Sequence, residues 1–380
     1  MLPPPVSVGR GFSRAGEQPR VLTADRGDDG LRLDLVLRRH LTDLNSATRT
    51  RVQSWIEKGL VTVNGLPVRR VSTRAALGDI VAVALPEEAP RAAMAAEDVR
   101  LDVLYEDDHL LAIDKPAGVV VHPTDKHAQG TVMNALLWHA RAWPAPQRPS
   151  LVSRLDKLTS GVIVVAKTAA AHAALQRAMT SNPASAKGFG ERGAASAKGF
   201  GERSPASAKG FGESGAEKDY LAIVYGRVNV ARGEIDLRLG KDHSDRRKVV
   251  ASVDVGAESL TRFERLARVA APRAGLSLLR CRLATGRTHQ IRVHLAARGW
   301  PLVGDPAYGE PRWSQIVDPL LAATLRAFPR QALHAWRVAF THPITRARLT
   351  LEAPVPGDLE ALLEASGLSA LFQTAVDRAR

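Results

Sequence analysis

Hydrophobic residues between positions 31 and 86 recur first at helical and then at strand spacing. Intervals of three and four residues predict helices over Leu33–Leu41 and about Ser46–Lys58. The alternation over Val61–Val68 predicts a hairpin, because its centre, Asn64-Gly65, is the dipeptide that two-residue hairpin turns favour. We therefore expect a small α/β domain in this part of the chain.

From residue 101 onward, short apolar runs outnumber helical patterns. The run Val162–Ala166 is β-branched and predicts a buried strand. There is no regular alternation of strands and helices and no Gly-rich dinucleotide turn, so the fold class is α+β with a large mixed or antiparallel sheet. Other strands are expected over 103–105, 110–113, 119–123, 219–228, 275–283, 333–340 and 347–351, and helices over 131–141, 168–179, 288–298 and 319–327.

The same patterns set the expected limits of the parts. They are a disordered tail over 1–30, the small domain over 31–86, an alanine-rich linker over 87–98, the large domain over 99–357 and a helical tail over 358–380. No apolar run approaches the length of a membrane span, and the first 20 residues lack the apolar centre of a signal peptide.

A repeat interrupts the large domain over residues 184–214, where ASAKGFGE recurs at an 11-residue period. Such a period builds a right-handed supercoil only with several apolar positions per unit, and each unit has a single Phe between glycines. We interpret the segment as a flexible, low-complexity insertion. The alternative is an arm that stacks Phe189, Phe200 and Phe211 on RNA bases.

Charge and cysteine content narrow the partners and the compartment. Lys and Arg number 53 against 39 Asp and Glu, and the resulting charge of +14 favours RNA or DNA as a partner. The single cysteine, Cys281, excludes an intramolecular disulfide and a CxxC metal site and fits the reducing cytosol. We therefore expect a cytoplasmic protein with a nucleic-acid partner and no membrane association.

Basic residues gather on the polar faces of the small domain, among them Arg49, Arg51 and Lys58. They predict a surface that contacts phosphates without reading sequence, and the alternative is an ordinary solvated basic face. The domain resembles the small RNA-binding domain named after ribosomal protein S-four, which implies RNA binding through the second helix. The resemblance rests on Thr48-Arg49-Thr50, Ile56-Glu57-Lys58-Gly59, Val61-Thr62-Val63-Asn64-Gly65 and Gly78-Asp79.

Motifs for metal, nucleotide and redox cofactors are missing from the sequence. It has no His-Glu-x-x-His, no P-loop and no Gly-x-Ser-x-Gly elbow, and none of its 11 histidines has a convincing metal spacing. We expect no cofactor and no metal, so that Asp, Tyr, Arg and Lys side chains carry the chemistry.

Three stretches bring such side chains together: Arg154-Leu155-Asp156, Lys218–Leu221 and Gly286–His294. An ionised carboxylate beside a core strand is costly unless it is paired or used. Arg292, on a helix that Thr288 is expected to cap, is the natural partner of Asp156 and would keep it ionised inside the core. Tyr220 offers a flat ring for stacking and a hydroxyl. Each residue taken singly also has an ordinary structural interpretation.

In this order, the stretches closely resemble the RluA/RluD-like pseudouridine synthases, from about Leu101 to Pro356 outside the insertion. The layout with the N-terminal domain is most similar to the members that modify ribosomal RNA. The resemblance includes Asp114–Pro123, Arg154–Lys157 with Thr159-Ser160-Gly161, Lys218 with Tyr220, Gly286–His294, Gly304-Asp305-Pro306, Leu333-His334-Ala335 and His342-Pro343.

The resemblance implies a role for each matched residue. Asp156 would be the catalytic carboxylate, acting either as a nucleophile on the sugar or through a glycal. Arg292 would hold Asp156, and Tyr220 would pack against the base and assist proton transfer. Arg154 would help to fill the gap left by a flipped uridine, and Lys115 with Pro116 would shape the floor of the site.

The chain departs from the family pattern at Ser153, where a His is usual, and at Leu158, where a polar residue is usual. These departures, like the insertion before Tyr220, concern contacts to RNA more than catalysis. The expected substrate is ribosomal RNA, in the first place that of the large subunit, with transfer RNA as the alternative. The expected state is a monomer. Two alternatives stay open: an RNA-binding protein without activity, and a hydrolase with Asp114 or Asp305 as a second carboxylate within about 10 Å of Asp156.

Overall fold

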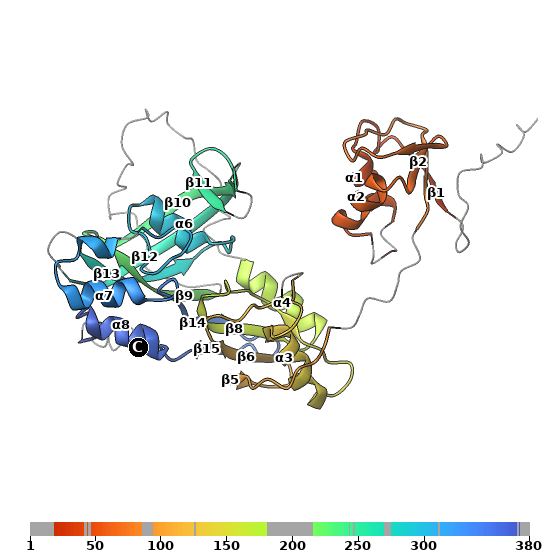
Figure 1. The fold of residues 1–380 in the computed structure, drawn as a ribbon. Helices are drawn as coiled ribbons and strands as arrows, with labels where there is room; N and C mark the ends of the chain where they lie inside the picture. The colour runs from red at the N-terminus through yellow and green to blue at the C-terminus, as the bar shows by residue number, and fades with distance from the viewer. Residues whose placement is uncertain are drawn as a thin grey trace, which may run out of the picture. The chain divides into compact units, whose positions relative to one another are not determined.

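The computed structural model describes residues 19–41, 44, 47–85, 94–124, 127–180, 216–242, 244–245, 248–269, 275–310, 312–370 and 372. The chain divides into two compact units between Ala93 and Met94 (Figure 1). The repeat over 184–214 and the first 18 residues lie outside the described residues.

The smaller unit is a four-stranded antiparallel sheet in the order β1-β4-β2-β3 with two helices. Its turn at Asn64-Gly65 has positive φ at both residues, 50° and 84°, as the predicted hairpin requires. Its core contains Leu33, Leu37 and Ile56 from the two helices. The elements are β1 Arg20–Thr23, α1 Leu33–His40, α2 Arg49–Glu57, β2 Val61–Val63, β3 Leu66–Val68 and β4 Ile80–Val83.

The larger unit is built on one sheet with the order β11-β10-β12-β13-β9-β14-β8-β6-β5, in which β15 pairs with β14 and β7 with β8. Among the described strands only β14 and β8 pair in parallel, so the predicted mixed α+β sheet is confirmed. Its strands are β5 Asp102–Glu106, β6 Leu110–Lys115, β7 Ser150–Leu151, β8 Ser160–Ala166, β9 Glu217–Tyr225, β10 Arg232–Lys241, β11 Val249–Ser252, β12 Ala257–Val269, β13 Leu276–Leu283, β14 Leu333–Thr341 and β15 Arg348–Glu352. The helices are α3 Val132–His139, η1 Ala140–Ala142, α4 Ala169–Thr180, α6 Gln290–Ala297, η3 Arg312–Gln315, α7 Pro319–Ala327 and α8 Gly357–Ala365.

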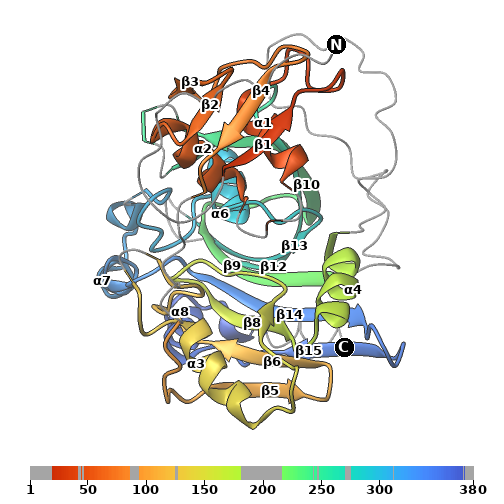
Figure 2. The same cartoon turned by 90° about the vertical axis from the view of Figure 1, so that its right-hand side faces the viewer.

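Both faces of this sheet are covered, which explains the continuous apolar run in β8. Val162 and Val164 pack with α4, whereas Ile163 and Val165 pack with α3 on the other face. Farther along the sheet, α6 packs on one face and α7 and α8 pack on the other. Figure 2 shows strands β10, β12 and β13 curving around α6. The sheet thereby holds α6 next to β9 and the loop before β8.

Several sequence predictions differ from the structure. Residues 119–123 form no strand, because the carbonyls of Val120 and Val121 accept the first amides of α3 instead of a neighbouring strand's. β1 lies within the segment predicted to be a disordered tail and pairs with β4. The helix expected from Thr288 begins at Gln290, and its N-cap is His289, in the left-handed conformation.

Two expected boundaries also fall inside the folded units. Glu97, in the predicted linker, bonds to residues at the start of α3, so the end of that linker packs on the larger unit. The predicted C-terminal tail begins as α8, whose Leu359, Leu362 and Leu363 are buried in the core with β9 and β13. No helix among the described residues has the length and apolar character that a membrane crossing needs.

Candidate active site

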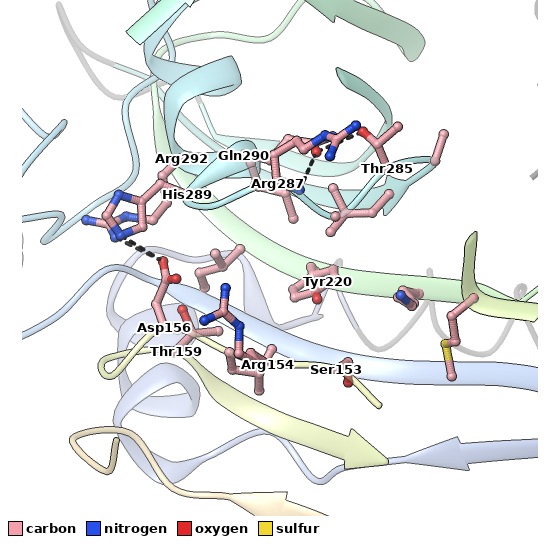
Figure 3. Close-up of a pocket in the computed structure, with 18 of the residues that line it drawn as sticks. Ser153, Arg154, Asp156, Thr159, Tyr220, Thr285, Arg287, His289, Gln290 and Arg292 are labelled. Atoms are coloured by element: carbon pink, nitrogen blue, oxygen red, sulfur yellow. Dashed lines mark hydrogen bonds and ion pairs between the residues drawn. The ribbon is translucent and has the colours of Figure 1, made fainter. Parts of the chain in front are cut away.

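A cleft of about 500 Å³ lies between the loop before β8, strand β9 and the loop that leads into α6. Figure 3 shows Asp156 at one side of it, facing Arg292, with Tyr220 on the strand between the two walls. Four residues predicted for the site line this cleft together: Arg154, Asp156, Tyr220 and Arg292. Segments separated by more than 130 residues in the sequence therefore converge on one cavity.

Arg292 connects two carboxylates. Its Nη1 donates to Asp156 Oδ2 at 3.0 Å, and its Nε and Nη2 donate to the two oxygens of Asp305 at 2.7 and 2.8 Å. Burial opposes the guanidinium charge, but Asp305 and Asp156 outweigh it and raise the pKa of Arg292. The side chain of Asp156 is 28% exposed, whereas that of Asp305 is 1% exposed. The expected ion pair is present, and Asp156 lies at the cleft wall rather than inside the core.

His289 approaches Asp156 from the same side as Arg292, with Nε2 3.8 Å from Oδ2. Its Nδ1 lies 2.9 Å from the hydroxyl of Tyr308, and that hydroxyl accepts the amide of Val249. Because the carboxylate of Asp156 can only accept, the ring proton lies on Nε2, and Nδ1 then accepts from the Tyr308 hydroxyl. Burial lowers the pKa of His289 by more than the nearby Asp156 raises it, so the ring is neutral near pH 7.

The loop Asp305–Gly309 supports this side of the site. Asp305 Oδ1 also accepts the amides of Ala307 and Tyr308, and the ring of Tyr308 lies 5.0 Å from the guanidinium carbon of Arg292. Backbone amides and Arg292 together lower the pKa of Asp305 despite its burial. One turn of the chain thus orients both Arg292 and His289.

Tyr220 lies on β9, with its ring packed against the cluster that includes Ile291 and Leu333. Burial, and secondarily the Asp156 carboxylate, raise the pKa of Tyr220, so its hydroxyl stays protonated in the physiological range. No hydrogen-bond partner of this hydroxyl occurs in the described part of the chain. The ring therefore presents a flat apolar surface and an available hydroxyl to the cleft.

Lys115 fixes the backbone just after Asp156 and ties it to the turn that follows β6. Its fully buried ammonium donates to the carbonyls of Pro116, Val119 and Lys157 at 2.6, 3.1 and 3.2 Å. Burial lowers the pKa of Lys115 to about 8, and Arg330 adds to this effect. All three ammonium donors are engaged, so Lys115 builds the floor and has no proton donor directed at the cleft.

The remaining predicted contact residues fall into two places. Arg154 is exposed at the cleft, near Ser153. In the smaller unit, Arg49 and Arg51 lie on α2 and Lys58 is its C-cap residue, with Arg49 and Lys58 exposed. None of these three residues lines the cleft.

One group of acids and histidine in the described chain is close enough to share a metal ion: Asp25, Asp28 and His40. Arg39 already occupies it, because its Nη1 lies 2.7 Å from Asp25 Oδ1 and 2.8 Å from Asp28 Oδ1. His40 Nε2 bonds to the other oxygen of Asp28 at 2.7 Å. These groups satisfy one another, and their geometry is that of an ion-pair cluster.

The hydrolase alternative required a second carboxylate facing Asp156. Asp305 does lie close to Asp156, since both bind one guanidinium, but its oxygens are filled by Arg292 and two backbone amides. Asp305 also lies outside the lining of the cleft. Because Asp305 is buried and lies outside the cleft lining, its carboxylate orients Arg292 and does not face a substrate.

The sequence analysis did not identify His289 or Tyr308 as site residues, nor the role of Asp305 in supporting Arg292. The signal for His289 was its place three residues before Arg292, one helical turn away. Tyr308 had no local signal, because its contacts to Val249 and His289 join segments 59 and 19 residues away.

Comparison with known proteins gives consistent matches over both units. The model of the RNA pseudouridylate synthase family matches residues 109–187 and 203–297, and that of the S4 domain matches residues 31–81. The chain is 37% identical over 317 residues to ribosomal large subunit pseudouridine synthase D of Pseudomonas aeruginosa, covering 83% of this chain and 87% of that protein. It is 36% identical to the uncharacterized RNA pseudouridine synthase YlyB of Bacillus subtilis, covering 84% and 90%. The structure of human RNA pseudouridylate synthase domain containing 1 aligns over 75% of this chain and 97% of that chain, with 21% identity and a TM-score of 0.48.

Proposed function

This chain belongs to the RNA pseudouridylate synthase family and is an isomerase acting on RNA, and we propose that it converts uridine to pseudouridine in large-subunit ribosomal RNA with Asp156 as the reacting carboxylate. The observation that carries the proposal is the 3.0 Å bond from Arg292 to Asp156 in a cleft that also holds Tyr220. The substrate class is supported by the relative from Pseudomonas aeruginosa, which is named for the large ribosomal subunit.

The reaction breaks the bond from ribose C1′ to uracil N1, turns the uracil and joins C1′ to C5. C5 loses a proton and N1 gains one, so atoms and electrons balance without an oxidant or reductant. The site must therefore supply an oxygen near the ribose, a surface that keeps the detached uracil in place, and groups that move a proton.

Asp156 meets the first requirement with its Oδ1 atom. Arg292 and His289 approach Oδ2, and no described residue bonds to Oδ1. Oδ1 is thus the oxygen that reaches the ribose, either by attacking C1′ or by taking a proton from C2′ on the glycal route. Arg292 holds the carboxylate in one orientation for either route.

Tyr220 and Arg154 meet the other requirements. The protonated Tyr220 ring supports the uracil by packing, and its hydroxyl is available to donate a hydrogen bond. Arg154, exposed at the cleft, fills the space that the flipped uridine leaves in the RNA. Arg49, Arg51 and Lys58 of the smaller unit bind phosphates and add affinity without sequence readout.

We further propose that the enzyme acts as a monomer in the cytoplasm, whose reducing conditions fit the single free cysteine, Cys281. Transfer RNA is the second substrate class to be offered in any test.

The experiment compares wild type with Asp156→Asn on ribosomal and transfer RNA fragments. Pseudouridine is mapped by chemical modification and reverse-transcription stops, and RNA affinity is measured in parallel. We expect a site-specific stop with wild type and none with Asp156→Asn, at similar affinity. Asp108→Asn, an exposed carboxylate on the β5–β6 turn, is the matched control and keeps full activity.

Two results would contradict the proposal. A stop of equal strength with Asp156→Asn would remove Asp156 from the chemistry. Tight binding by wild type without a stop in any ribosomal fragment would exclude that substrate class, and a stop in transfer RNA alone would reassign it.

A further inference from the structure

Lys218 lies in the cleft and has no bonding partner among the residues that the structure describes. It is two residues before Tyr220 on β9, so both side chains project from the same face of the strand. Lys218 is half-buried and lines the cleft. In the part of the chain that the structure describes, no carboxylate or other acceptor lies within bonding distance of its ammonium.

The acids on either side of Lys218 are directed elsewhere. Asp219 binds Arg282 through both oxygens at 2.6 and 2.7 Å. Glu217 is shared between Arg282 and Arg348, at 2.9 and 2.8 Å. These two acids are therefore already neutralised. No acid in the described ranges therefore compensates the charge of Lys218 in the cleft.

A half-buried ammonium without an anion is costly, and burial lowers the pKa of Lys218 accordingly. The cleft holds two more cations, Arg154 and Arg287, that make no ion pair with a described acid. A site with this charge surplus gains most from a ligand that brings negative charge. Uracil and ribose are neutral, so the anion of an RNA substrate is its phosphodiester.

We propose that Lys218 binds one phosphodiester of the RNA, at a linkage next to the uridine that packs on Tyr220. Two residues along a strand span about 7 Å, so a nucleotide held at Tyr220 brings its own linkage within reach of Lys218. The lysine acts as a compact point charge of the kind that binds phosphate without reading sequence. This inference rests on the proposed function, because it requires the target uridine at Tyr220.

The test uses wild type, Lys218→Met and Lys218→Arg, with Lys241→Met as a matched control. Lys241 is an exposed lysine at the end of β10, outside the cleft. We expect Lys218→Met to lower kcat/KM about tenfold and to reduce the slope of log affinity against log salt by about 0.7 to 0.9. Lys218→Arg restores both, and Lys241→Met leaves kcat/KM unchanged.

Substrates with a single neutral methylphosphonate linkage, placed 5′ or 3′ of the target uridine, then locate the contact. We expect one of the two neutral linkages to lower the kcat/KM of wild type about tenfold. The same linkage should leave the kcat/KM of Lys218→Met unchanged. Equal losses in both proteins at both linkages would overturn the proposal, because Lys218 would then act through the structure and not through a phosphate.

The salt dependence separates this inference from the proposed function. If wild type binds RNA but forms no pseudouridine, the proposed function fails while the affinity measurements still apply. An unchanged salt slope in Lys218→Met would then overturn the phosphate contact on its own.

Discussion

The guanidinium of Arg292 binds Asp305 through two nitrogens and Asp156 through only one. Asp305 is buried, so Arg292 makes its stronger contact with a residue that no substrate reaches. Arg292 is thus fixed by Asp305 and presents its third nitrogen to Asp156. The orientation of the reacting carboxylate depends on a residue outside the cleft.

Replacing Asp305 with Asn is expected to affect both stability and turnover. The amide presents donors to Arg292 and leaves a buried guanidinium half-paired, so the free energy of unfolding falls by about 3 kcal/mol or more. The freed Arg292 holds Asp156 less well, so kcat falls more than KM rises. Urea unfolding and steady-state kinetics measure the two effects.

Glu310→Gln is the control for Asp305→Asn. It breaks an exposed ion pair, that of Glu310 with Arg312, in the same loop. Such a change alters the free energy of unfolding by less than about 1 kcal/mol. A kcat for Asp305→Asn equal to that of wild type would show that Asp305 does not position Arg292 for catalysis.

Tyr308→Phe is expected to change the tautomer of His289. In wild type the Tyr308 hydroxyl donates to Nδ1 and keeps the proton on Nε2, and phenylalanine removes that donor. Nitrogen chemical shifts of His289 at pH 7.5 should then move from the Nε2–H form toward a mixture of the two neutral forms. Tyr105→Phe, which removes a hydroxyl bonded to Asp107, should leave these shifts in place. Unchanged shifts in Tyr308→Phe would mean that another group selects the tautomer.

The sequence predicted the parts of the site that rest on local signals. Asp156 stood out because a charge next to the β-branched run of β8 needs an explanation, and Arg292 because it lies between apolar neighbours on a helix. The pairing of these two could be inferred from charge alone. The contact of the loop Asp305–Gly309 with Arg292 could not be inferred, because a Gly-Asp-Pro stretch has the composition of any turn.

The same limit explains the errors in the fold. Strands β10 and β12 were missed because their exposed faces carry Arg and Glu that pair across strands, as Arg232 does with Glu264, and this masks the apolar alternation. Residues 119–123 have strand-like composition, but their carbonyls cap α3. Strand pairing and helix capping depend on contacts between separate segments of the chain. The pattern of apolar residues within one segment does not predict these contacts.

Gly161→Ala is expected to destabilise the fold far more than Gly118→Ala. A Cβ at residue 161 would lie 2.2 Å from the carbonyl oxygen of Ala335, and φ there is +114°. The clash falls on the parallel pairing of β8 with β14, so we expect a loss above about 3 kcal/mol. Gly118 has φ +89° but open space around it, so its substitution costs about 1 to 2 kcal/mol. Thermal unfolding of the two variants measures both losses. Similar decreases in melting temperature would refute the steric argument.

Asp114→Asn is expected to stabilise the protein in a pH-dependent way. Asp114 lies opposite Asp102 in the β5–β6 pair, and burial, with the Asp102 charge, raises the pKa of Asp114 to about 6. Because the folded state holds this proton more tightly than the unfolded state, the contribution of Asp114 to the free energy of unfolding falls as pH rises from about 4 to 6 and then stays level. The variant lacks this loss, so above pH 6 its free energy of unfolding exceeds that of wild type by about 1 to 2 kcal/mol. This is less than the ~3 kcal/mol that corresponds to the whole pKa shift, because solvent screens a half-buried group.

Urea unfolding of wild type and Asp114→Asn at pH 4, 5, 6 and 8 measures that difference directly, since contributions from all other groups cancel between the two proteins. Asp102→Asn is the control, because it removes only the charge of the exposed neighbour. Burial is the larger cause of the shift, so this control should recover less than half of the gain. The difference in free energy of unfolding between Asp114→Asn and wild type could instead be the same at pH 4 and pH 8. That result would show that Asp114 is not protonated in the folded state near pH 5. The desolvation argument for this strand pair would then fail.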